Sequence, residues 1–169
     1  MARAAAGLPQ PSLACCNALH AARGGSTVST VSRPLPPAVT VVSAAEASAV
    51  LALSPPDGVL LLSAEGAGGF LGAAGWRALV TAAGGQAPDA LCCAGAPGDA
   101  LLAIRAGCRI IVLDGRLPAF GVVHGAAREA GALLLPARPP SLAVRSLNLA
   151  HPAGRARLAD WLRAGPAAG

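Results

Sequence analysis

Two carboxylate side chains lie at positions typical of a catalytic or binding site, because each ends an apolar run and precedes a glycine. Glu65 follows LLLSA and Asp114 follows RIIVL. At the carboxyl ends of parallel strands, enzymes place acids, bases and metal ligands. If both side chains face one crevice, they could act as an acid/base pair or hold a divalent cation. Asp-Gly is also a common turn pair, so Asp114 could instead hydrogen-bond its own turn. Glu65 and Asp114 are the candidate catalytic residues.

Arginine must supply any positive charge at such a site, because the chain contains no lysine. Without lysine there is neither a Schiff-base amine nor a P-loop ammonium. Arg116 and Arg138 follow the fourth and fifth apolar runs, and a guanidinium can hold a carboxylate or phosphate with two hydrogen bonds. We predict that they bind a ligand together with Ser63 and Gly115, which lie at the same strand ends.

A glycine cluster follows Glu65, in the stretch EGAGGFLG. A dinucleotide-binding fingerprint anchored on Gly66 and Gly68 needs Gly or Ala at position 71, where Leu71 stands. The free backbone N–H groups of a strand-to-helix turn could still receive an anion. Gly66, Gly68 and Gly69 therefore complete the predicted ligand-binding set.

Histidines and cysteines do not suggest a catalytic or metal centre. The histidines are far apart, and none ends an apolar run, which makes a Ser-His-Asp triad or a His-based metal site improbable. The cysteines match neither CxxC metal spacing nor a disulfide framework. These residues are His20, His124, His151, Cys15, Cys16, Cys92, Cys93 and Cys108. We expect no metal, no cofactor and reduced thiols, as in a cytoplasmic protein.

The net charge of +5 is unevenly distributed. Residues 1–37 carry three arginines and no acid, whereas the rest has ten arginines against eight acids. No basic cluster interleaved with aromatic residues suggests nucleic-acid binding, and no stretch of about 20 residues is apolar enough to suggest a membrane span. The N-terminal segment has the composition of a transit peptide or of a disordered extension, and we favour the extension. The expected partners are a small anionic metabolite and, as an alternative, a second copy of the chain.

Five continuous apolar runs alternate with Ala-rich segments of helical length, which predicts strands buried on both faces of a parallel sheet. The runs cover residues 39–43, 58–64, 90–95, 109–115 and 132–137, and the helical segments cover 44–53, 69–85, 98–107, 118–131 and 154–165. Ser43 and Glu46 form a capping box, Asp99 is a possible N-cap, and Gly107 and Gly131 suit helix ends. We expect one α/β domain over 38–165, with an extension at 1–37 and a tail at 166–169.

Two architectures fit about five such βα units. One is a flavodoxin-like open sheet, and the other is a half (β/α) barrel that would need a second copy to cover its open face. We favour the open sheet, because a half barrel exposes two edges.

The stretch LLAIRAGCRIIVLDG (101–115) resembles the AGADIIMLDN type of segment in phosphoribosyltransferase barrels, which handle phosphorylated small molecules. The chain as a whole resembles small uncharacterised α/β proteins of GC-rich proteobacteria. The first resemblance implies a phosphate-handling (β/α)-barrel activity, and the second implies no function.

Three functions stay open at this stage. The favoured one is non-catalytic binding of a small anionic ligand, or self-association. The second is a small lyase, isomerase or transferase that acts on a phosphorylated metabolite, with Asp114 and Glu65 at its centre. The third is a degenerate barrel fragment that binds no ligand.

Overall fold

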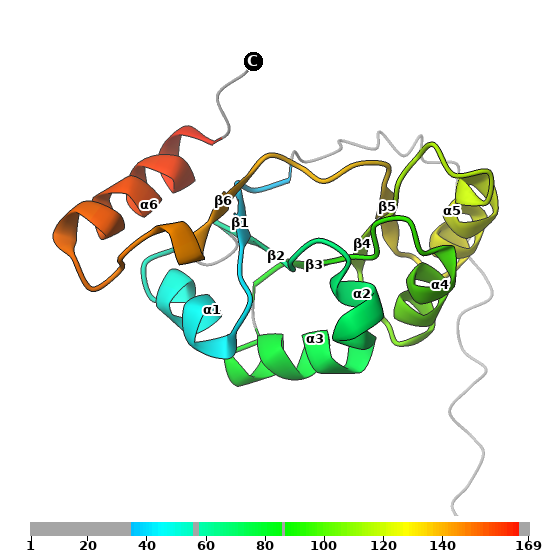
Figure 1. Ribbon diagram of the computed structural model, residues 1–169, viewed down its shortest axis with the longest axis horizontal. Coiled ribbons are helices and arrows are strands. Elements are labelled where there is room, and N and C mark those ends of the chain that lie inside the picture. Colours follow the sequence, from blue (N-terminus) through cyan, green and yellow to red (C-terminus); the bar gives the residue numbers. More distant parts are fainter. Residues whose placement is uncertain (1–34, 56–57, 86, 166–169) are drawn as a thin grey trace, which may run out of the picture. The chain divides into compact units, whose positions relative to one another are not determined.

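Short parallel strands and helices alternate along the chain in the computed structural model, which describes residues 35–55, 58–85 and 87–165 (Figure 1). Nearly all of the predicted extension 1–37, the tail 166–169, Cys15, Cys16 and His20 lie outside the described residues. The strands are β1 (Ala38–Thr40), β2 (Leu60–Leu62), β3 (Asp89–Cys92), β4 (Ile110–Val112), β5 (Leu133–Leu135) and β6 (Ser141–Ala143). The helices are α1 (Ala44–Leu51), α2 (Ala67–Phe70), α3 (Gly72–Ala82), α4 (Pro97–Arg105), α5 (Phe120–Glu129) and α6 (Pro152–Ala164), with a 3₁₀ turn, η1, at Val144–Ser146.

Helix boundaries follow the local signals in most places. Ser43 caps α1 by accepting a hydrogen bond from the N–H of Glu46, as the capping box predicts. Gly107 and Gly131, which follow α4 and α5, have positive φ. The N-cap prediction for Asp99 is wrong, because α4 starts at Pro97 and places Asp99 in its first turn. A carboxylate is favourable there too, since it faces the positive end of the helix dipole.

The strands form one open sheet in the order β5-β4-β3-β2-β1-β6, with every neighbouring pair parallel. The predicted α/β fold with an open parallel sheet is therefore confirmed. From β1 to β5 each strand lies beside the one before it, always on the same side. Right-handed crossovers then place successive helices on one face of the sheet. A flavodoxin-like sheet differs from this arrangement, because it has helices on both faces. The order of strands and helices here corresponds to that of a (β/α) barrel, although the sheet does not close.

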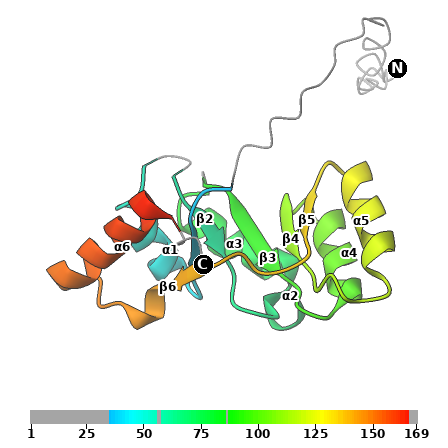
Figure 2. The ribbon, with the colours of Figure 1, turned by 90° about the horizontal axis from the view of Figure 1, so that it is seen from above.

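The return from β5 to β6 requires the sheet to be curved. Only residues 136–140, which we call the strap, join Leu135 to Ser141, and six chain steps span at most about 22 Å. In a flat sheet, the five inter-strand gaps between β5 and β6 would measure about 24 Å across, before any displacement along the strands. The sheet must therefore curl toward the strap. Figures 1 and 2 show the strap crossing the face opposite to α1, α3 and α4.

Curling creates two separate apolar layers. The larger layer packs side chains of the helices, such as Val50, Trp76 and Leu158, against the outer face of the sheet. In the inner layer, every described buried side chain comes from a strand, and Leu60, Leu62 and Val112 are almost fully buried there. Over the described residues, the inner face that a half barrel would leave open is thus buried within one chain. In the described part of the chain, no helix is long and apolar enough to cross a membrane.

One strand was missed by the sequence analysis. β6 has only three residues, Ser141–Ala143, in a Pro-rich segment without an apolar run. Its partner β1 holds it in place through the pairs Ala38 with Ser141 and Thr40 with Ala143. Strand β6 is therefore specified by the neighbour that it pairs with, not by its own composition.

Candidate binding site

A pocket of about 660 Å³ lies at the carboxyl ends of β2 to β5 and beneath the strap. Its charged lining side chains are Glu65, Asp114, Arg116 and Arg138. Its other walls include Cys92, Val112 and Pro136. This is the edge of the sheet at which both competing architectures place a ligand site. The structure thus brings together both candidate carboxylates, both candidate arginines and Gly115.

Asp114 and Arg116 neutralise each other within one turn. The Asp114 carboxylate accepts hydrogen bonds from the backbone N–H of Arg116 and from two nitrogens of its guanidinium, the shortest at 2.7 Å. These bonds lower the pKa of Asp114 to about 2, and they raise the pKa of Arg116. The turn interpretation of Asp114 is therefore correct. Since proton transfer is most efficient with a pKa near the working pH, this carboxylate is a poor general base.

Arg138 has no carboxylate partner among the described residues. It is half-buried, and its guanidinium donates one hydrogen bond to the carbonyl of Ser63 at 3.0 Å and one to the hydroxyl of Thr40 at 3.1 Å. Thr40 Oγ1 lies 2.9 Å from the hydroxyl of Ser141, the first residue of β6. Arg138 therefore ties the strap to the ends of β1 and β2 while keeping its full positive charge beside the pocket.

Ser63 supports Arg138 by an exchange of hydrogen bonds. Ser63 donates its N–H to Ala90, so the regular parallel ladder would have the Ser63 carbonyl accept from the N–H of Cys92. That N–H instead bonds to the Ser63 hydroxyl at 2.8 Å, and the free carbonyl accepts from Arg138. The hydroxyl also donates to the carbonyl of Ala64. Ser63, which we predicted to bind ligand directly, is only 1% exposed and acts here by positioning Arg138.

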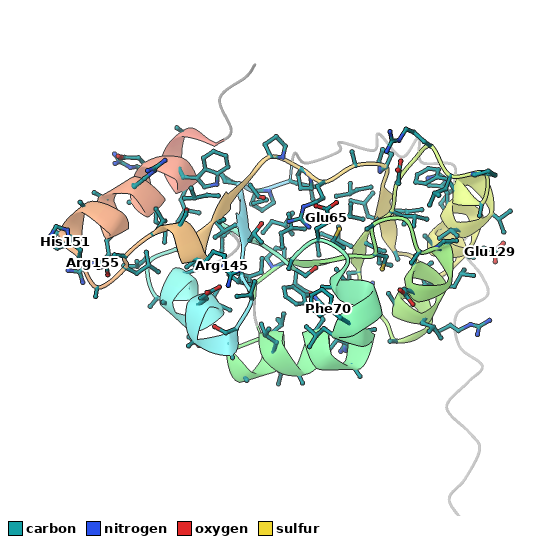
Figure 3. All side chains as sticks on the ribbon, in the orientation of Figure 1. Glu65, Phe70, Glu129, Arg145, His151 and Arg155 are labelled. Atoms are coloured by element: carbon teal, nitrogen blue, oxygen red, sulfur yellow. The ribbon has the colours of Figure 1, made fainter. Side chains whose placement is uncertain are left out.

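Glu65 is exposed at the pocket mouth and has no ion-pair partner in the part of the chain that the structure describes. Figure 3 shows it in the middle of the molecule, between the sheet and the strap. Because its neighbour Gly66 has a φ of +68°, the chain turns sharply into α2 directly after Glu65. The local backbone therefore directs the helix away from the site and leaves Glu65 beside it.

Within the glycine cluster, Gly68 and Gly69 lie close to neighbouring side chains, whereas Gly66 is required for its positive φ. A Cβ on Gly68 would lie 2.7 Å from Cys93 Sγ and 3.2 Å from Cys93 Cα, so α2 can approach β3 only without a side chain there. A Cβ on Gly69 would lie 3.2 Å from a carboxylate oxygen of Asp99, and a negative charge at that position opposes an anion. The residues Gly66, Gly68 and Gly69 do not line the pocket.

Backbone strain lies at the pocket wall opposite the strap. Ala94 has a φ of +47°, which is the one positive value of a non-glycine residue in the described chain. A side chain in this conformation costs about 1 kcal/mol or more. The carbonyl of Ala94 accepts from the N–H of Asp114 at 2.9 Å, and Gly115 bonds to the carbonyl of Pro136 at 2.8 Å. This network of backbone bonds fixes the loops that surround the pocket.

The histidines and thiols stay outside the charged cluster. His124 is exposed on α5 and stacks on Phe120, whereas His151 caps α6 through Nδ1. Burial and the nearby Asp99 raise the pKa of Cys93 to about 12, and burial also raises that of Cys108. Cys92 lines the pocket wall. Over residues 35–55, 58–85 and 87–165, no three His, Cys, Asp or Glu side chains gather as metal ligands.

Thr40, Ala94 and the strap prolines belong to the site but were missed by the sequence analysis. Thr40 lies inside the predicted run 39–43, and only the structure shows that β1 ends at this residue. The sequence RPP at residues 138–140 could have indicated that the strap is an extended segment. The stretch 101–115 forms the end of α4, then β4 and the Asp114 turn. No family model matches the chain, and no curated protein or solved structure with which it was compared is significantly similar to it.

Proposed function

We propose that this domain binds a small anionic ligand in the pocket at the carboxyl ends of β2 to β5, without catalysing its reaction. The observation that carries the proposal is Arg138, a half-buried guanidinium that contacts only neutral oxygens and lines the pocket. A half-buried cation without a counter-ion attracts an anion more strongly than a solvated one, because water screens it less.

The state of the two carboxylates supports binding over catalysis. Asp114 is held ionised by Arg116, and Glu65 is exposed to solvent. General acid/base catalysis uses a group whose pKa lies near neutrality, and the pKa of Asp114 lies far below it. The alternative of an enzyme acting on a phosphorylated metabolite would have to rely on these two groups.

The charge balance limits the ligand to a weakly charged anion. Glu65 and Asp114 contribute two negative charges to the pocket, and Arg116 and Arg138 contribute two positive ones. A doubly charged phosphate would bring the pocket to a net charge of −2, whereas a carboxylate leaves one excess negative charge. We therefore propose a small carboxylate or a monoanion as the ligand. A second copy of the chain is not required, since the inner layer is already buried.

Binding can be tested by thermal shift and isothermal titration with a panel of small carboxylates and phosphorylated metabolites. A ligand that binds only the folded state raises the melting temperature. Arg138→Gln should abolish the shift, and Arg105→Gln is the matched control, because Arg105 is exposed at the end of α4 and does not line the pocket. If no compound shifts the wild type, or if both variants bind equally well, the proposal is wrong.

A further inference from the structure

The pocket contains one uncompensated charge of each sign. Asp114 and Arg116 form a bidentate ion pair with each other. Of the charged lining residues, this leaves Glu65 and Arg138, neither of which forms an ion pair within the described chain. A ligand with an anionic group alone would satisfy Arg138 and be repelled by Glu65.

The hydrogen bonds of Arg138 anchor it to groups other than Glu65. Two of its nitrogens bond to the carbonyl of Ser63 and the hydroxyl of Thr40, and the strap that carries it is rich in proline. Glu65 is followed by the fixed turn at Gly66. The two charges line one pocket but do not form an ion pair in the described structure, so each is available as a separate binding point.

We propose that the ligand is zwitterionic, a small amino carboxylate whose carboxylate lies at Arg138 and whose ammonium group lies at Glu65. This inference rests on the proposed anion binding at Arg138 and adds the second half of the ligand. The ion pair between the ligand's ammonium group and Glu65 cancels the repulsion that a simple carboxylate meets. The pocket with such a ligand has no net charge. Its apolar walls, Cys92, Val112 and Pro136, contact the methylene groups between the two charges.

The probes are an unbranched series of amino carboxylates, from glycine through β-alanine and γ-aminobutyrate to longer homologues. Each is paired with the simple carboxylate of the same length. Isothermal titration of the full chain gives the affinity of each member. We expect one chain length to bind best, and removal of its amine to weaken binding about fivefold, the equivalent of about 1 kcal/mol for an exposed ion pair.

Glu65→Gln should remove the advantage of the amino carboxylate and leave the simple carboxylate bound as well or better. Glu129→Gln is the matched control, since Glu129 is exposed at the end of α5, on the outer side of the molecule (Figure 3). Arg138→Gln should weaken both members of a pair.

The outcomes separate this inference from the function on which it rests. If simple carboxylates bind as tightly as their amino counterparts, or if Glu65→Gln affects both alike, the zwitterion inference is refuted while anion binding at Arg138 stands. If neither class binds the wild type, both proposals fall. An amine-dependent affinity that Glu65→Gln abolishes and Glu129→Gln preserves supports the zwitterion.

Discussion

Replacing Ser63 with alanine tests how the strap and the sheet are joined. Ser63→Ala removes the hydroxyl that accepts the N–H of Cys92 in the buried end of the β2–β3 ladder. Two responses are available to the chain. Either the N–H of Cys92 stays unpaired, or it returns to the carbonyl of residue 63 and competes there with the guanidinium of Arg138.

Both responses cost stability. An unpaired buried N–H costs about 1–3 kcal/mol. In the second response the N–H of Cys92 only exchanges one acceptor for another, so the cost is the loss of the Arg138 bond, about 1.5–3 kcal/mol, as is typical of a hydrogen bond from a charged group. We therefore expect Ser63→Ala to destabilise the protein by about 1–3 kcal/mol. For a domain of this size, the melting temperature falls by about 4 °C per kcal/mol, so the expected decrease is about 4–12 °C.

Urea unfolding and thermal melting provide the measurement. Ser146→Ala is the matched control, since its hydroxyl also donates to a backbone carbonyl but is exposed. The control should lose less than about 0.5 kcal/mol, as is usual for surface changes. Equal stability of the two variants would refute the hydrogen-bond exchange at Ser63. Ser63→Ala should also weaken anion binding if the second response occurs, because Arg138 then loses one of its two anchors.

Two other changes test the packing and the electrostatics. Gly68→Ala should destabilise the protein by about 1–3 kcal/mol, as overpacking does, because its methyl group would meet Cys93. Gly125→Ala in α5 meets open space and should stabilise by up to about 1 kcal/mol, so denaturant melts showing equal effects would contradict the packing argument. Burial raises the pKa of Asp89 from 3.8, although the hydrogen bond from Trp76 opposes the shift. The folded state then binds this proton more tightly than the unfolded state, so the stability contributed by Asp89 is present below pH 3.8 and is lost as the pH rises through the folded pKa. Asp89→Asn should gain stability relative to wild type over that interval in unfolding experiments, and a pH-independent difference would exclude the proposed linkage.

Local signals in the sequence were sufficient for the first five strands and for the edge of the sheet that carries the site. The apolar runs predicted β1 to β5, because a strand buried on both faces needs a continuous apolar run. The Ser43 and Glu46 pair predicted the start of α1, since capping involves only near neighbours in the chain. The Asp114 turn could be anticipated for the same reason. Parallel strands bring their carboxyl ends to one edge, so Glu65, Asp114, Arg116 and Arg138 could be assigned to one region without coordinates.

Only the tertiary structure decided which of these charged groups remain free to bind a ligand. Arg138 meets Ser63 across 75 residues of sequence, through a strap whose path depends on the curl of the whole sheet. Strand β6 forms because it pairs with β1, and Gly68 is required by the close approach of α2 to Cys93. The sequence by itself determined the types of charge at the pocket. The Asp114–Arg116 ion pair is local, because both residues lie in one turn. The fold determined that Glu65 and Arg138 form no ion pair in the described chain, because their separation depends on the packed sheet and on the path of the strap.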